Sequence, residues 1–163
     1  MGQTIIVGIG QEQRGDDAVG LLVVEQWRAD FGHHHPEVLV EQIGSPGLAL
    51  IDRLRGFQRA ILVDAVAVDQ PAGTLLCLDE VDLAAFDLGS RSAHGWGVAE
   101  SLRIARAVLP GELPPHLRLL GIAIEPPHVG AAPTAEVMAA VGPAAIRLEA
   151  MLREPAPAIG QIG

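Results

Sequence analysis

The sequence of 163 residues contains no tyrosine, two tryptophans, three phenylalanines and one cysteine. Aliphatic side chains must therefore fill its core. The lone Cys77 excludes an internal disulfide and a zinc site made of several cysteines, and is most simply a small buried apolar residue. No apolar run approaches the roughly 20 residues of a membrane-spanning helix, and the N-terminus lacks the basic and apolar regions of a signal peptide. We therefore expect a cytoplasmic protein.

Basic residues are scarce as well. The chain has 11 Lys and Arg residues against 20 Asp and Glu residues, which gives a formal net charge of -9. This balance argues against a nucleic-acid partner, which needs a basic patch, and against an anionic membrane surface. With 49% hydrophobic residues the chain can build a full core. We expect a single α/β domain over residues 1–153, followed by a flexible tail over residues 154–163.

Short apolar runs alternate with stretches of helical periodicity along the chain. We expect strands over residues 4–8, 38–43, 60–64, 74–78 and 117–124, and helices over residues 16–31, 48–55, 98–109 and 134–153. This alternation predicts an α/β three-layer sandwich, with a mainly parallel five-stranded sheet and helices on both faces. The third and fourth strands are joined by a turn shorter than the roughly twelve residues of a parallel crossover, so the fourth should be antiparallel. Residues 79–95 are expected to form a long loop.

A glycine-rich loop follows the first strand and leads to two acidic residues. Three glycines punctuate residues 8–15, and Asp16 and Asp17 come next. We expect Asp16 to cap the helix that follows. Gln13 occupies the third glycine position of a dinucleotide-binding G-x-G-x-x-G motif, which makes such a site a weak hypothesis. Ligands of open α/β sheets bind where strands end, but a tight turn with a capping aspartate would show the same pattern.

Two further residues could join Asp17 in a site. Asp64 ends the apolar strand 60–64, where a buried carboxylate is costly unless it is paired or coordinated. His94 lies in a loop before the helix 98–109. Two oxygen donors and one nitrogen donor suit a divalent metal such as nickel or zinc. If the first and third strands are neighbours, both carboxylates lie on one crevice. The spacing does not show that the three residues converge, and Asp64 could instead accept backbone hydrogen bonds.

For the other candidate residues we favour a structural role in loops over a role in chemistry. Glu125 and His128 follow the last strand and should form a rigid loop rim at the same edge of the sheet. The histidines of His33–His35 lie at the opposite edge and are interpreted as a solvated loop. The sequence contains no G-x-x-x-x-G-K-[ST] phosphate loop, no H-E-x-x-H and no G-x-S-x-G motif. These absences argue against the corresponding nucleotide, zinc-protease and serine-hydrolase sites.

In their order along the chain, these motifs resemble those of the [NiFe]-hydrogenase maturation endopeptidases. The segments that carry the resemblance are Gly8–Gly10, Gly15–Gly20, Val63–Ala65, Ser92–His94, Glu125–Pro126 and Pro133–Thr134. The resemblance implies an α/β sandwich with one antiparallel strand. It implies an enzyme that removes a C-terminal extension from the hydrogenase large-subunit precursor after nickel insertion. It also implies that Asp17, Asp64 and His94 bind the metal, with nickel carried by the substrate and another divalent metal able to substitute.

The chemistry and two other function classes remain open at this point. The metal could polarise the scissile carbonyl as a Lewis acid, or a carboxylate could activate water as a general base. The chain could instead be a nickel-binding maturation module without peptidase activity. It could also be an α/β enzyme that binds a nucleoside between Gly8 and Asp17, although an acidic crevice disfavours anionic phosphates.

Overall fold

The structure, a computed structural model, describes residues 3–12, 15–86, 97–125 and 132–155. In chain order, its elements are β1 (Thr4–Ile9), the 3-10 turn η1 (Gly15–Ala18), α1 (Val19–Phe31), the 3-10 turn η2 (Gly32–His34), β2 (Leu39–Ile43), α2 (Leu48–Leu54), β3 (Arg59–Ala67), β4 (Leu75–Asp79), α3 (Glu80–Phe86), α4 (Val98–Val108), β5 (His116–Ile124) and α5 (Ala135–Arg153). The expected strands and helices are therefore all present, with small shifts at their ends.

The sheet has five strands in the order β2-β1-β3-β5-β4. β2, β1, β3 and β5 pair in parallel, and β4 pairs antiparallel with β5. The expected α/β fold with one antiparallel strand is thus confirmed. β5 lies between β3 and β4, although β4 follows β3 in the chain. The turn before β4 reaches β5 through Gly73, whose N–H donates to the Ala123 carbonyl at 2.8 Å. Cys77 on β4 is half-buried, and its sulfur lies 3.8 Å from that of Met151.

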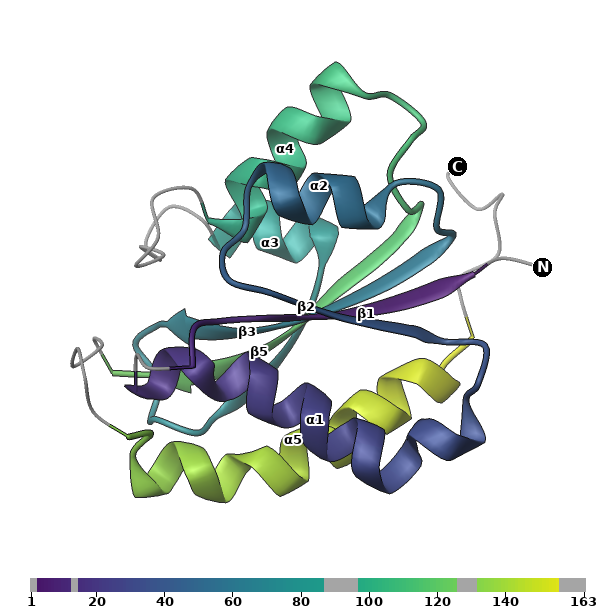
Figure 1. The fold of residues 1–163 in the computed structure, drawn as a ribbon. Helices are drawn as coiled ribbons and strands as arrows, with labels where there is room; N and C mark the ends of the chain where they lie inside the picture. The colour runs from purple at the N-terminus through teal and green to yellow at the C-terminus, as the bar shows by residue number, and fades with distance from the viewer. Residues whose placement is uncertain (1–2, 13–14, 87–96, 126–131, 156–163) are drawn as a thin grey trace.

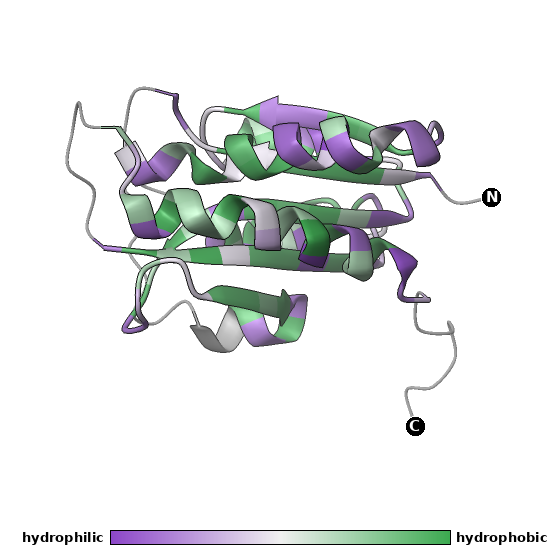
Figure 2. Cartoon of the chain, turned by 90° about the horizontal axis from the view of Figure 1, so that it is seen from below, coloured by the Kyte–Doolittle hydropathy of each residue, from purple (hydrophilic) through white to green (hydrophobic). Residues whose placement is uncertain are grey.

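Helices cover both faces of the sheet. In Figure 1, α1 and α5 lie below the sheet, and α2, α3 and α4 lie above it. Alternate strand residues point to opposite faces, so Ile6 packs with α1 and α5 while Ile5 packs with α2 and α4. Figure 2 shows hydrophobic colouring along much of the inner strands and mixed colouring along the helices. None of the helices in the described part of the chain is long and apolar enough to cross a membrane.

The expected long loop over residues 79–95 is wrong in its first part, because residues 80–86 form α3. The backbone N–H of Asp79 donates to the carboxylate of Asp82 at 3.1 Å, which is half of a capping box at the start of this helix. Leu83 is buried in the core beneath α2 and α4. The hydrogen bond at its start and the burial of Leu83 together stabilise this short helix. Residues 87–95 lie outside the described part of the chain.

Candidate functional site

The carboxyl ends of β1 and β3 form a switch point in the sheet. From β1 the chain crosses through α1 to β2 on one side, and it then returns through α2 to β3 on the other side. The two crossover helices cover opposite faces (Figure 1). Gly8 is paired with Val63, so Asp64 comes level with the last residue of β1. The neighbouring strands on which the predicted site depends are therefore confirmed, and this is the place where open α/β sheets bind ligands.

Asp17 lies in η1, directly before α1, and only 5% of its surface is exposed. Gly10 is packed against it. A Cβ atom at Gly10 would lie 2.3 Å from the Asp17 carbonyl oxygen, so a larger residue would push the turn away. The Gly10 N–H donates to the Ile43 carbonyl at 3.0 Å, which ties the same loop to the end of β2. These two contacts fix the backbone of Asp17 against the ends of β1 and β2.

Gly20 brings α1 onto the strand ends. A Cβ atom there would lie 2.4 Å from the carbonyl oxygens of both Ile9 and Val63. Because both contacts are with backbone atoms, neither could move aside without disturbing a strand. The first turn of α1 therefore sits directly on β1 and β3, next to Asp64. Gly10 and Gly20 therefore allow close packing at this edge.

Asp64 is half-buried inside β3, which continues to Ala67, so the expectation that Asp64 ends its strand is wrong. It lies beside the last residue of β1, where that strand ends and β3 goes on. Burial raises the pKa of its carboxyl well above the usual range, and the nearby charge of Asp17 raises this pKa further. A hydrogen bond from the Ala65 backbone N–H acts in the opposite direction and is the smaller effect. The structure thus brings together two of the three predicted metal-binding residues, in an arrangement that disfavours two negative charges. A cation held between the two carboxylates would relieve their repulsion.

Asp16 does not cap α1, so that expectation is wrong. Its oxygens accept two hydrogen bonds from Thr134, one from the backbone N–H at 2.6 Å and one from the hydroxyl at 3.1 Å. The N-cap of α1 is Ala18, because residues 15–18 form a separate 3-10 turn. Asp16 is 7% exposed and joins this turn to the start of α5. The two adjacent aspartates therefore face different partners.

The third predicted ligand, His94, lies outside the described residues, as does His128. Glu125 is exposed after the end of β5. Among the residues that the structure describes, no group of three or more His, Cys, Asp or Glu side chains could hold a metal ion. The described part of the predicted site is therefore the Asp17–Asp64 pair.

A family model described as hydrogenase maturation protease, HycI, matches residues 22–149 of the chain. The chain belongs to this family. It is 28% identical over 158 residues to the Hydrogenase 2 maturation protease of Escherichia coli K12. The matched region covers 92% of this chain and 90% of that relative. The expected family and its proteolytic activity are confirmed, which favours the protease over the binding-module and nucleoside-enzyme alternatives.

Solved structures of hydrogenase maturation proteases have the same fold. The hydrogenase maturating endopeptidase HybD from E. coli matches with a TM-score of 0.77 and 25% identity, over 93% of this chain and 92% of that one. The [NiFe] hydrogenase maturation protease HybD from Thermococcus kodakarensis matches with a TM-score of 0.70 and 22% identity, over 91% of this chain and 98% of that one. The second match supports the fold alone.

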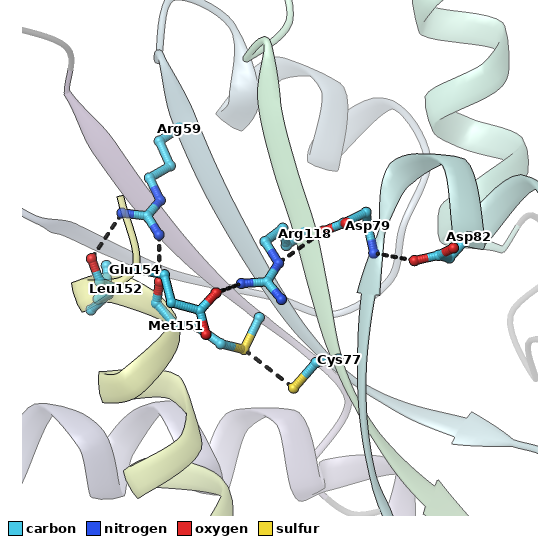
Figure 3. Close-up of polar contacts among 8 residues, drawn as sticks. All are labelled: Arg59, Cys77, Asp79, Asp82, Arg118, Met151, Leu152 and Glu154. Carbon is cyan, nitrogen blue, oxygen red and sulfur yellow. Dashed lines mark hydrogen bonds and ion pairs between the residues drawn. The ribbon is translucent and has the colours of Figure 1, made fainter. Parts of the chain in front are cut away.

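A cavity of about 750 Å³ lies at the opposite edge of the sheet of this protease, away from Asp64. Its charged lining residues are Arg59, Asp79, Glu80, Arg106, His116, Arg118 and Glu154. Figure 3 shows how part of this set is paired: Arg118 binds Asp79 at 2.9 Å and also Glu154, while Arg59 donates to the Leu152 carbonyl at 2.8 Å. These contacts hold β4 and the end of α5 to the sheet. We therefore assign a structural role to the charged residues of the cavity.

One histidine of His33–His35 has a structural role that the sequence did not indicate. His33 and His34 are exposed, as expected, but His35 is half-buried. Its Nε2 lies 2.9 Å from Glu149, and its ring stacks on Trp27 with centroids 5.8 Å apart. The Trp27 indole N–H donates to the same carboxylate at 3.0 Å. The solvated-loop expectation is therefore wrong for His35, which helps to join the ends of α1 and α5.

Proposed function

We propose that this protease removes a C-terminal extension from a [NiFe]-hydrogenase large-subunit precursor after nickel has been inserted. We further propose that Asp17, Asp64 and His94 recognise that nickel. The observation that carries the proposal is the pair of acidic residues beside the end of β1, Asp17 in the turn before α1 and Asp64 in β3. Burial raises the pKa of Asp64, and the charge of Asp17 raises it further. Two carboxylates and an imidazole form a donor set that a divalent nickel ion accepts.

Nickel belongs to the substrate in this proposal, and it acts as a checkpoint. A precursor that carries nickel brings a cation between the two carboxylates and so gains binding free energy. A nickel-free precursor leaves Asp17 and Asp64 facing each other and forms no such contact. Specificity is a difference in affinity between the two precursors, and a pair of like charges enlarges that difference.

The reaction is hydrolysis of one peptide bond. Water adds to the carbonyl carbon, the bond to nitrogen breaks, and the leaving amine takes a proton. Two routes remain open: nickel polarises the scissile carbonyl, or a carboxylate removes a proton from the attacking water. In the second route, Asp64 is the described candidate, because a raised pKa brings a carboxyl closer to the range in which it exchanges protons at neutral pH.

The intact mass of the large subunit from cells with and without this gene tests the proposal. Without the gene, we expect a subunit that is heavier by its C-terminal peptide. A plasmid copy should restore the mature mass, and so should the control variant Asp52→Asn, which replaces an exposed acid on α2. Copies carrying Asp17→Asn, Asp64→Asn or His94→Ala should leave the heavier form. An equal mass with and without the gene would contradict the proposal.

A further inference from the structure

Asp16 and Thr134 connect the starts of two helices that lie side by side on one face of the sheet. α1 and α5 both begin on the side of the sheet at which β1 ends (Figure 1), and Asp17 lies in the turn directly before α1. Asp16 belongs to the turn before α1, and Thr134 is the N-cap residue of α5. Their two hydrogen bonds, at 2.6 and 3.1 Å, join segments that are 118 residues apart in the chain. We infer that Asp16 is a positioning residue of the protease, which acts by fixing Asp17.

The hydrogen bonds from Thr134 show why Asp16 acts through Asp17 and does not itself enter the candidate site. Each of its oxygens accepts a hydrogen bond from Thr134, and the residue is 7% exposed. The backbone N–H that it binds lies at the N-terminal end of α5, where the helix dipole and the unpaired N–H groups favour a negative charge. Asp16 is therefore held toward α5. Asp17 belongs to the same turn, which packs against β1 and β3 beside Asp64, and its charge adds to burial in raising the pKa of Asp64.

Asp17 needs such support because its turn is short. It lies in a 3-10 turn of four residues between a glycine-rich loop and α1. On one side, Gly10 packs against the Asp17 carbonyl and its N–H binds β2. On the other side, the Asp16–Thr134 contact ties the turn to α5. Ligands of a metal must be held within about 0.5 Å of the productive geometry, so losing one tie should displace Asp17 enough to weaken recognition.

The same two helices carry a second buried contact that serves as a matched control. Near their other ends, Trp27 donates to the carboxylate of Glu149 at 3.0 Å. Glu149 is 5% exposed, so it is buried to the same degree as Asp16 and joins the same elements. It lies at the opposite edge of the sheet from Asp17. A change there should lower stability without moving the candidate site.

The experiment compares four variants with the nickel-loaded large-subunit precursor encoded in the same genome. Thr134→Val removes the hydroxyl and keeps the backbone N–H, and Asp16→Asn removes the charge. We expect both to raise KM about 10-fold, as is typical when a residue supporting a metal ligand is lost. Thr134→Ser keeps the hydroxyl and should restore the wild-type KM. Glu149→Gln should lower Tm and leave KM unchanged.

This inference rests on the proposed role of Asp17, so Asp17→Asn is measured alongside. If Asp17→Asn loses recognition while Asp16→Asn and Thr134→Val keep the wild-type KM, the positioning inference is wrong and the proposed function stands. A fall in kcat that follows the folded fraction, at constant KM, would also overturn it, because it would indicate a purely structural role. If Asp17→Asn processes the precursor normally, the proposed nickel recognition itself fails. Thr134→Val is a milder change than Asp16→Asn and keeps the test valid if Asp16→Asn folds poorly.

Discussion

Asp17 lies close enough to Asp64 for its charge to add to the effect of burial in raising the pKa of the Asp64 carboxyl, although the two residues belong to different elements. The fold places Asp17 in the turn before α1 and Asp64 inside β3, both beside the end of β1, and the repulsion between them adds no stability. Perturbed carboxyl groups of this kind are concentrated at functional sites. The pair therefore supports the proposal that the active site of the protease lies beside the end of β1.

Replacing Asp64 should stabilise the protein and abolish processing. A carboxyl whose pKa is raised in the folded state destabilises the fold at any pH above that pKa, and this cost disappears as the pH falls below the ordinary value of 3.8. Asp64→Asn removes the repulsion by Asp17 and keeps an oxygen for the Ala65 N–H. At pH 7 we expect a gain of about 0.5–2 kcal/mol in the free energy of unfolding. Thermal denaturation at several pH values would measure it.

The exposed acid Asp52 provides the control for that experiment. Asp52→Asn should change the free energy of unfolding by less than about 0.5 kcal/mol, as surface substitutions usually do. A lower Tm for Asp64→Asn than for the wild type at neutral pH would show that the Asp64 carboxylate stabilises the fold. Such a result would contradict the argument that the Asp17–Asp64 pair is kept for function at a cost in stability.

The contact between α1 and α5 at Glu149 should depend on pH. Burial acts to raise the pKa of Glu149, but hydrogen bonds from His35, Trp27 and Arg153 lower it overall below its ordinary value of 4.5. Its stabilising contribution is therefore fully present above 4.5 and is lost as the pH falls through the lower folded-state pKa. Glu37, whose carboxylate lies 3.6 Å from the His35 ring, is the other acidic residue beside His35.

Glu149→Gln is the variant that isolates this effect. Above pH 5 we expect it to lower the free energy of unfolding by about 1–3 kcal/mol, because it removes the buried charge and replaces one of the two oxygens that accept hydrogen bonds from Trp27, His35 and Arg153. The difference from the wild type should shrink as the pH is lowered below 4.5. Urea unfolding followed by circular dichroism between pH 3 and pH 7 would show whether it does. A constant difference over this range would contradict the assignment to the Glu149 charge.

Gly20 should tolerate no larger residue. A Cβ atom would lie 2.4 Å from two strand carbonyl oxygens, so Gly20→Ala should cost about 1–3 kcal/mol and displace the start of α1. Gly44→Ala is the control, because a Cβ atom there would meet nothing within 4 Å. Paired measurements of Tm and processing would test this. Equal stability of the two variants would refute the close contact between α1 and the strand ends.

His94 carries the part of the site that follows from the family resemblance. His94→Ala removes the proposed nitrogen donor, so we expect it to abolish processing of the nickel-loaded precursor. The far-ultraviolet circular dichroism spectrum and Tm should stay those of the wild type. Processing at the wild-type rate by this variant would remove His94 from the site.

Much of the fold could be predicted because the relevant signals are local. The apolar run that ends at Asp64 identifies a central strand, and the short turn containing Gly73 predicts the antiparallel direction of β4. The strand order follows less directly, since nothing in the sequence around β4 shows that β5 lies between it and β3. α3 escaped prediction because it is short, although the spacing of Asp79 and Asp82 is a signal of a helix start.

The candidate site was predictable where it depends on strand ends, and unpredictable where it depends on distant partners. In the sequence, Asp17 follows the first apolar run and Asp64 closes the third, so the pairing of β1 with β3 brings them together, although β3 itself continues to Ala67. Asp16 looked like a local cap, because its partner Thr134 lies 118 residues away. His35 looked like a solvated residue for the same reason, as its partner Glu149 is 114 residues distant. Pairs of this kind arise from tertiary packing and leave no periodic pattern in the sequence.

Intact mass spectrometry of the purified large-subunit precursor, incubated with the purified protease, tests the central claim most directly. The precursor is prepared in nickel-loaded and nickel-free forms that otherwise have the same composition. We predict that the nickel-loaded form loses a C-terminal peptide and that the nickel-free form keeps its mass. Asp17→Asn and Asp64→Asn should abolish the loss. Cleavage of both forms at the same rate would contradict nickel recognition, and cleavage of neither would contradict the proposed substrate.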